Sequence, residues 1–202
     1  MITLFWCPRT RAARALWMLE ELGQPFEIKH IDIRDEASKN NPMFRAASPM
    51  GKVPALMDDE VLISDSAAIC LYLADRYADA GLAPALDSPG RGRFLYWMMF
   101  TPSVLEPAMA EKFGGWEPNK FAHGWGDFDS MIKTLESGLK QGPWLMGESF
   151  SAADVVVGSS ANFLKMFNIL PESPVIEAYI DRCLERPAYQ RTMAREEAAL
   201  AG

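Results

Sequence analysis

The hydrophobic pattern of the chain changes character near residue 80. In residues 1–78, short apolar runs typical of strands alternate with amphipathic stretches typical of helices. After residue 88, the apolar positions have the three-to-four-residue spacing of helices, although Val155–Val157 is a β-branched run that a propensity count would assign to a strand. The pattern therefore predicts a mixed α+β domain followed by an all-helical domain.

The first part of the chain predicts a strand, a helix and a second strand. Strands are expected over residues 2–6 and 26–31, because Phe26 and Ile28 alternate with polar neighbours in the second run. Gly23 follows the intervening helix, as expected of a helix stop. That helix has one apolar face, made of Ala12, Ala15, Leu16, Leu19 and Leu22. Such a unit has the length that closes a parallel crossover.

A hairpin and a second helix complete this domain. The apolar runs 53–57 and 61–63 are separated by a polar segment that is only long enough for a tight turn, and residues 66–77 have a helical pattern. The predicted order is β-α-β, a variable segment, then β-β-α, which forms a four-stranded mixed sheet.

The remaining chain is predicted to consist of a linker and helices. Residues 79–87 contain Gly and Pro and show no periodicity. We therefore divide the chain into residues 1–78, a linker over 79–87, and a helical domain over 88–202. The helices expected in that domain cover approximately residues 91–113, 120–140, 152–167, 174–185 and 187–199.

Composition narrows the classes of function. The net charge is -7, from 20 Lys and Arg against 27 Asp and Glu, which argues against a nucleic-acid partner. The longest apolar run, residues 94–100, is far shorter than the ~20 residues of a membrane span, and the N-terminus lacks a basic segment followed by a long apolar one. We therefore expect a cytoplasmic protein without a membrane segment.

The thiols and imidazoles do not form a recognisable ligand set. The three cysteines are widely scattered without CxxC spacing, and the only histidines are His30 and His123. Neither a disulfide framework nor a metal site is expected. Cys70 and Cys183 lie in apolar helical segments, where packing is the favoured interpretation.

Cys7 stands in the segment Cys7–Arg11, where the first strand ends and the helix begins. The free N–H groups and positive dipole end of a helix favour a thiolate there, as does the charge of Arg9, Arg11 and Arg14. Cys7 is therefore a candidate nucleophile, or a donor that stabilises the thiolate of a ligand. The alternative is a half-buried structural cysteine.

Two further segments suggest a ligand with an amino-acid end. Pro54 stands at the entrance of a strand, where a cis peptide bond would leave the Val53 backbone able to pair with an extended peptide. An ordinary trans proline on an edge strand is the alternative. Asp65 and Ser66 begin a helix whose amides suit a carboxylate, while Asp65 suits an ammonium group; simple capping is the alternative.

The helical domain contains one capping signal and one aromatic stretch. Ser151 and Asp154 have the spacing of a capping box, which predicts the start of a buried helix. Residues 94–100 are apolar on all sides of a helix, which favours core or a subunit interface over a substrate pocket.

Together these motifs resemble the glutathione transferase superfamily over essentially the whole chain. The matching segments are residues 4–12, 19–23, 48–56 and 64–69 and the capping box at Ser151. The resemblance implies a thioredoxin-like N-terminal domain joined to an all-helical C-terminal domain, usually as a homodimer in the cytosol. It also implies glutathione as co-substrate, without a metal.

The resemblance assigns roles to five binding residues. Pro54 corresponds to the family's cis-proline, Val53 to the residue whose backbone pairs with the cysteinyl unit of glutathione, and Lys52 to a contact near the glycyl carboxylate. Asp65 and Ser66 correspond to the pair that holds the γ-glutamyl end. Most relatives carry Glu or Gln at the position of Asp65, so its reach to the ammonium group is shorter here.

The resemblance places Cys7 where other classes have a catalytic Ser or, in the omega-like group, a Cys followed by Pro. Thr10 is the nearest alternative hydroxyl. A Ser would activate the glutathione thiol for attack, whereas a Cys can form a mixed disulfide with glutathione. The predicted enzyme is a glutathione S-transferase, acting in detoxification on a small apolar electrophile or on a mixed disulfide.

Two other functions are compatible with the same fold. The first is a non-catalytic member that binds ligands or proteins. The second is an isomerase of an unsaturated dicarboxylate, as in the zeta group, but the Ser-Ser-Cys signature of that group is absent around Cys7. The candidates for the second-substrate pocket are Tyr96, Phe100, Phe113 and Trp116.

Overall fold

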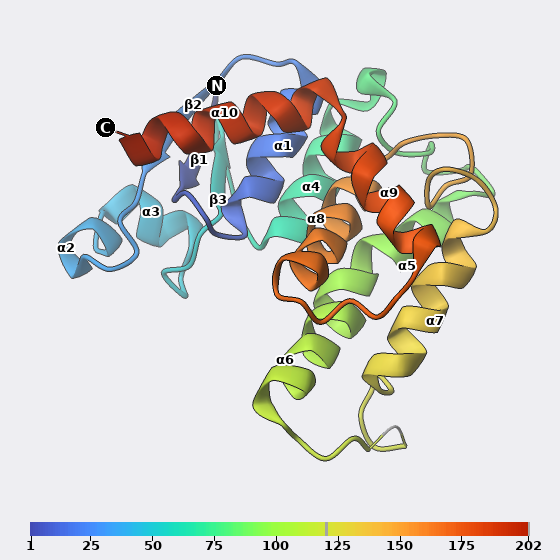
Figure 1. Ribbon diagram of the computed structural model, residues 1–202. Helices are drawn as coiled ribbons and strands as arrows, with labels where there is room; N and C mark the ends of the chain where they lie inside the picture. Colours follow the sequence, from blue (N-terminus) through green and yellow to red (C-terminus); the bar gives the residue numbers. More distant parts are fainter. Residues whose placement is uncertain (120, 202) are drawn as a thin grey trace. The chain divides into compact units, whose positions relative to one another are not determined.

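The computed structural model describes residues 1–119 and 121–201. Its contacts divide the chain into two units, Met1–Ala80 together with the residues from Glu185 onward, and Gly81–Leu184 (Figure 1). The sequence pattern assigned residues 88–202 to one helical domain. The division by contacts differs because the last helix packs against the first helix of the chain.

The first unit contains a four-stranded mixed sheet. The strands are β1 (Ile2–Trp6), β2 (Phe26–His30), β3 (Ala55–Asp58) and β4 (Val61–Ser64), in the order β2-β1-β3-β4. Strand β1 is parallel to β2 and antiparallel to β3, and β3 is antiparallel to β4. The predicted thioredoxin-like topology is confirmed. All residues of β1 are buried, because it lies inside the sheet and both of its faces are covered.

Helices α1 (Ala12–Leu22) and α4 (Ser66–Arg76) contact each other and the strands of the sheet. Helix α1 begins after the turn that follows β1 and ends at Gly23, whose φ of 66° is the left-handed conformation that glycine adopts most readily. A short 3-10 helix, η1 (Ala78–Ala80), follows α4. The predicted strand, helix and hairpin order is therefore present.

The variable segment between β2 and β3 contains two short helices, α2 (Glu36–Lys39) and α3 (Pro42–Ala47). Each begins at a side-chain cap, Asp35 for α2 and Asn41 for α3. The ring of Phe44 in α3 packs against Phe5 of β1, with 5.7 Å between the ring centroids. This contact anchors the variable segment to the sheet.

The last helix, α10 (Pro187–Ala201), packs against α1 in the first unit (Figure 1). The Tyr189 ring packs edge-on against Trp17, with 5.0 Å between centroids. Arg186 forms a two-pronged ion pair with Glu21, with N–O distances of 2.6 and 2.7 Å. The ion pair of Arg186, just before α10, and the ring contact of Tyr189 therefore fix the position of α10 on α1.

The second unit is helical, as the sequence predicts. The helices are α5 (Arg91–Phe100), α6 (Glu106–Gly114), α7 (Phe128–Leu139), α8 (Ala152–Met166) and α9 (Pro174–Leu184). Where one helix was expected over residues 91–113, the π-helical segment η2 (Thr101–Leu105) separates α5 from α6. The prolines at 102 and 107 lack the N–H groups that continue a regular α-helix.

Helix α7 starts later than the predicted helix over residues 120–140. Asp127 caps it through a hydrogen bond from the Ser130 N–H, with an N–O distance of 2.8 Å. Residue 120 itself lies outside the described residues. In the part of the chain that the structure describes, we find no helix with the length and hydrophobicity needed to cross a membrane.

Helix α8 begins at the predicted capping box. The Asp154 carboxylate accepts hydrogen bonds from the Ser151 N–H and hydroxyl, with distances of 2.9 and 3.0 Å. It also accepts the Leu145 N–H at 2.9 Å and the Tyr179 hydroxyl at 3.1 Å. Burial raises the pKa of Asp154 to about 6, although these donors oppose the rise. Asp154 thus joins α8, α9 and the preceding loop.

Candidate functional site

Cys7 follows the last residue of β1 and precedes the turn that leads into α1. The hydroxyl of Thr10 donates a hydrogen bond to the Cys7 carbonyl at 2.7 Å and accepts one from the Ala12 N–H at 3.1 Å. The single hydroxyl proton of Thr10 is therefore directed at the backbone. To donate to a ligand thiolate, the Thr10 hydroxyl would first have to leave the Cys7 carbonyl.

The three thiols differ in access to solvent. The exposed fraction is 9% for Cys7 and 0% for both Cys70 and Cys183. Burial raises the pKa of Cys70 to about 12, and its thiol lies 3.8 Å from the Arg14 carbonyl oxygen. The expectation that Cys70 and Cys183 are packing residues is confirmed. Cys7 is the most accessible thiol of the three.

Arg14 has a structural contact that the sequence pattern does not indicate. It is buried in α1, and its guanidinium donates a hydrogen bond to the Ser66 hydroxyl oxygen at 3.1 Å. Arg14 therefore connects α1 to the first turn of α4. Sequence reasoning missed this role because α1 is buried almost all round, between α4 and α10, whereas its pattern shows a single apolar stripe.

The segment before β3 has the expected backbone geometry. The Val53–Pro54 peptide bond is cis, as predicted. The Val53 side chain packs against a core cluster that includes Phe5 and Phe44. Among the described residues, the Val53 N–H and carbonyl take part in none of the backbone hydrogen bonds of turns, loops and caps. The Val53 backbone is therefore available to pair with another chain.

Ser48 holds the same segment from the other side, a role that sequence reasoning missed. Its hydroxyl accepts the Lys52 N–H at 2.9 Å and donates to the Lys52 carbonyl at 2.8 Å. Between them, Gly51 has a φ of 64°, and a Cβ at this position would lie 2.3 Å from the Arg45 guanidinium. Lys52 is exposed, so its ammonium group can reach an anionic ligand.

Asp65 caps α4 and is exposed at the same time. One carboxylate oxygen accepts the N–H groups of Ala67 and Ala68, with distances of 2.9 and 3.2 Å. Two of the amides expected to bind a ligand carboxylate are thus already paired with Asp65, so the capping interpretation is correct for this oxygen. Asp65 itself has a φ of 79°, an unusual value for a residue with a side chain.

The strand registers bring these segments to one edge of the sheet. Phe5 of β1 lies opposite Ala55 of β3, which in turn lies opposite Ser64 of β4. Because neighbouring antiparallel strands run in opposite directions, the residue two positions after Phe5 and the residue two positions before Ala55 emerge together. Cys7, Val53 and Asp65 therefore converge, although they are remote in sequence.

One more residue reaches this region from α10. The Glu196 carboxylate accepts a hydrogen bond from the Arg9 N–H at 3.0 Å, and Glu196 is 5% exposed. Sequence reasoning missed Glu196, although a signal was present. The buried face of α10 consists of residues spaced four apart, namely Ala188, Thr192 and Glu196. A carboxylate is unusual on the buried face of a helix, which is normally apolar.

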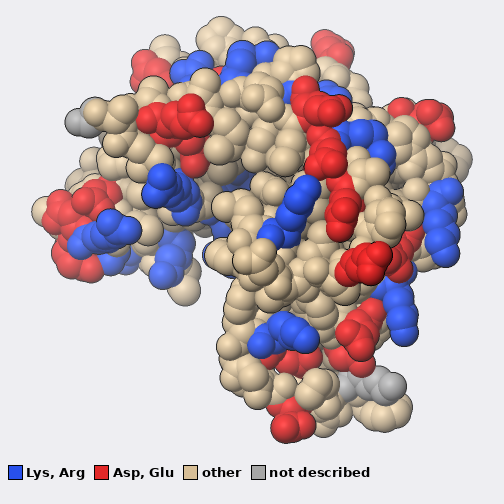
Figure 2. Space-filling view, in the orientation of Figure 1, with Lys and Arg blue, Asp and Glu red and all other residues tan. Residues whose placement is uncertain are grey.

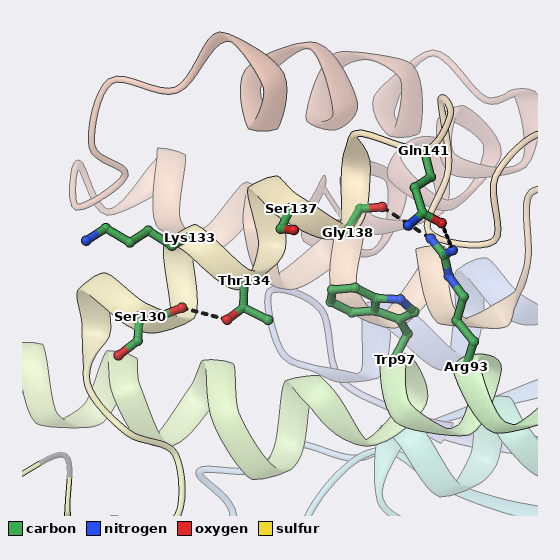
Figure 3. Close-up of a pocket in the computed structure, with 8 residues that line it drawn as sticks. All are labelled: Arg93, Trp97, Ser130, Lys133, Thr134, Ser137, Gly138 and Gln141. Atoms are coloured by element: carbon green, nitrogen blue, oxygen red, sulfur yellow. Dashed lines mark hydrogen bonds between the residues drawn. The ribbon is translucent and has the colours of Figure 1, made fainter.

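A separate cavity of about 570 Å³ lies in the second unit, between α5 and α7 (Figure 3). Arg93 of α5 donates to the carbonyls of Gly138 and Leu145, with distances of 3.3 and 2.9 Å, and to the Gln141 side chain. Trp97 packs against Gly138, where a Cβ would lie 2.2 Å from the ring. These hydrogen bonds fix the C-terminal end of α7 against α5. The lining includes none of the predicted site residues.

The described residues contain no group of three or more His, Cys, Asp or Glu side chains arranged to hold a metal ion. Acidic and basic side chains are interspersed on the molecular face shown in Figure 2, without a continuous basic field. The groups that the segments at the sheet edge carry include the Cys7 thiol, the Asp65 carboxylate and the Lys52 ammonium group.

Comparison with known proteins gives a consistent result. Residues 6–76 match the model of the glutathione S-transferase N-terminal domain, and residues 107–182 match that of the C-terminal domain. The chain is 25% identical to glutathione S-transferase GstA of Escherichia coli O157:H7 over 196 residues, covering 96% of this chain and 98% of that protein. It is 24% identical to the disulfide-bond oxidoreductase YfcG of Escherichia coli strain K12 over 211 residues, covering 98% and 96%.

The solved structures agree. A sphingomonad glutathione S-transferase in complex with glutathione superposes with a TM-score of 0.78 at 27% identity, covering 96% of this chain and 98% of that one. Both domain models match in the family's order, and the relatives align over nearly the whole length. The chain therefore belongs to the glutathione S-transferase superfamily.

Proposed function

We propose that this protein binds glutathione at the sheet edge of its first unit and uses it on a mixed disulfide or a small apolar electrophile. The observation that carries the proposal is the convergence of Cys7, Val53 and Asp65 at one edge of the sheet. The glutathione complex of the sphingomonad relative supports the choice of ligand.

Each part of glutathione has a suitable partner at this edge. The Val53 backbone can pair with the cysteinyl unit as an added strand would. The exposed carboxylate of Asp65 can form an ion pair with the γ-glutamyl ammonium group, and Ser66 is the next residue along the chain. The exposed ammonium group of Lys52 can form an ion pair with the glycyl carboxylate. Pro54 shapes the turn that presents Val53. Together these contacts would place the ligand sulfur near the end of β1.

Cys7 is the better candidate for the reacting group, because the Thr10 hydroxyl already donates to a backbone carbonyl. In the proposed reaction the Cys7 thiolate attacks the glutathionyl sulfur of a mixed disulfide, forms a Cys7–glutathione disulfide and releases the substrate thiolate, which takes up a proton. A second glutathione thiolate then attacks the glutathionyl sulfur, releasing oxidised glutathione and the Cys7 thiolate. The relative YfcG is named a disulfide-bond oxidoreductase, and this name supports the proposed chemistry.

The test combines binding with an activity panel. Retention on immobilised glutathione is measured first, followed by turnover of a glutathione mixed disulfide, a chloronitrobenzene and an organic hydroperoxide. We expect retention and turnover of the mixed disulfide, and the same behaviour in Ser151→Ala, a control variant in the second unit. Retention without turnover of any substrate would identify a non-catalytic binding protein, and loss of retention would refute the glutathione site.

We further infer a homodimer in the cytosol. Cys7 and Cys70 are free thiols, which fits a reducing compartment. Helix α5 carries exposed apolar side chains suited to an interface, namely Leu95, Tyr96 and Met99.

A further inference from the structure

The carboxylate of Glu196 occupies a position where α10 would ordinarily carry an apolar side chain. It continues the buried face formed by Ala188 and Thr192, and it is 5% exposed. Transfer of a carboxylate into such a position is unfavourable unless hydrogen bonds compensate for lost hydration. Burial raises the pKa of Glu196, while the N–H and charge of Arg9 lower it. A purely packing role would be served better by an apolar residue.

Among the described residues, the protein supplies a hydrogen bond to one of the two carboxylate oxygens of Glu196. Oε2 accepts the Arg9 N–H at 3.0 Å, whereas Oε1 is buried and has no hydrogen-bond partner there. The contact joins residues 187 positions apart. Through this hydrogen bond, α10 contacts the turn that follows Cys7.

Arg9 has an unusual backbone conformation that this hydrogen bond restrains. Its φ is 57°, in the left-handed region that residues with a Cβ seldom adopt. Pro8 has no N–H, so the Arg9 N–H is the first backbone donor after Cys7. On the other side, the Thr10 hydroxyl holds the Cys7 carbonyl at 2.7 Å. Two side chains therefore anchor the backbone around Cys7 and Arg9.

We propose that Glu196 is a positioning residue for Cys7, holding the Arg9 N–H so that the turn keeps the Cys7 thiol in its reactive orientation. The proposal rests on the proposed glutathione-dependent chemistry. Orientation of a reacting group contributes to rate only when its supporting contacts are fixed in advance. Arg191 of α10 pairs with Glu20, and Arg186, just before α10, pairs with Glu21, so the helix that carries Glu196 is fixed against α1.

Two substitutions separate the hydrogen bond from packing. Glu196→Gln retains a carbonyl oxygen that can accept the Arg9 N–H, whereas Glu196→Met fills the space without an acceptor. Arg195→Ala is the matched control, because it removes an ion pair to Glu20 from the same helix without a contact to Arg9. The measurements are kcat and KM with a glutathione mixed disulfide, the NMR resonance and exchange rate of the Arg9 amide, and Tm.

In Glu196→Met, we expect kcat to fall about tenfold, the effect of losing a hydrogen bond to a charged group, with KM for glutathione changed by less than about twofold. The Arg9 amide should lose its protection from exchange, while Tm is retained or raised. Glu196→Gln should keep the protection and most of kcat, and Arg195→Ala should leave both unchanged.

The proposal is overturned if Glu196→Met has the kcat of the parent protein, or if Glu196→Gln loses as much as Glu196→Met. An Arg9 amide that exchanges freely in the parent protein would also overturn it. If the parent protein shows no glutathione-dependent turnover, the proposed function fails separately. The rate of Cys7 alkylation by iodoacetamide, assigned by peptide mass analysis, then replaces kcat in the same comparison, with the same outcomes.

Discussion

Cys7 and Thr10 illustrate how a single hydrogen bond distinguishes two candidate groups. Both are near the N-terminus of α1. The Thr10 hydroxyl, however, donates a hydrogen bond to the Cys7 carbonyl and accepts one from the Ala12 N–H. Cys7 is 9% exposed, whereas Cys70 and Cys183 are fully buried. At the residue scale, we therefore propose nucleophilic chemistry at Cys7 rather than hydroxyl assistance by Thr10.

Replacing Cys7 tests this choice. Cys7→Ala should abolish reduction of mixed disulfides and spare retention on immobilised glutathione, because Val53, Asp65 and Ser66 lie in other segments of the chain. Cys7→Ser should retain or raise conjugation to a chloronitrobenzene, since a hydroxyl stabilises a bound thiolate without forming a disulfide.

Mass analysis after exposure to oxidised glutathione provides the direct check, with glutathionylation expected at Cys7. A Cys7→Ala variant with unchanged kinetics, together with a parent protein that resists glutathionylation, would remove Cys7 from the mechanism. Thr10 would then be the residue to replace next.

The start of α8 shows how an element is defined by a short motif and then tied to its neighbours. The capping box of Ser151 and Asp154 is a local signal, whereas the contacts of Asp154 with Leu145 and Tyr179 come from other segments. Burial raises the pKa of Tyr179 well above its usual value, so its hydroxyl stays protonated as a donor to Asp154. The motif thus organises the second unit.

The raised pKa of Asp154 predicts a pH dependence of stability. Because the pKa rises to about 6 in the folded protein, its protonation stabilises the folded state fully below about pH 4, and this contribution is lost as pH rises through about 6. The difference amounts to about 2 kcal/mol between pH 4 and pH 7.

Urea unfolding of the parent protein and of Asp154→Asn at pH 4.5 and pH 7 measures this contribution. The free energy of unfolding of the parent should decrease relative to that of the variant as pH rises. An identical pH dependence in both proteins would show that Asp154 keeps its ordinary pKa after folding.

At the scale of the whole molecule, one exposed apolar surface of the described residues is the outward side of α5. The inward side chains Phe94, Trp97 and Met98 are buried, whereas Leu95, Tyr96 and Met99 are 38%, 50% and 41% exposed. An apolar helix that buries only one side within its unit is typical of a subunit interface. The homodimer proposed above would cover this surface.

Charge placed on this surface tests the assembly. The double variant Leu95→Glu, Met99→Glu should sediment as a monomer at micromolar concentration, where the parent protein sediments as a dimer. Leu86→Glu is the control, because Leu86 is 77% exposed and lies outside α5. A parent protein that is monomeric at this concentration would contradict the prediction.

Local features of this protein were determined by the sequence alone. The order of the four strands with α1 and α4 follows from periodicity, and the stop of α1 at Gly23 and the capping box at Ser151 follow from local turn and capping signals. The helices α2 and α3 of the variable segment were not predicted. The sheet-edge residues were also recognisable, because Cys7, Pro54 and Asp65 each stand at a strand or helix end.

The tertiary structure decided the features that depend on remote contacts. Arg14 is buried because α4 and α10 cover both sides of α1, and Arg9 is restrained by Glu196 from the other end of the chain. Helix α10 joins the first unit for the same reason, although its own pattern matches the other C-terminal helices. A periodic pattern shows which face of a helix is buried, but the partner that buries it is set by packing between segments far apart in sequence.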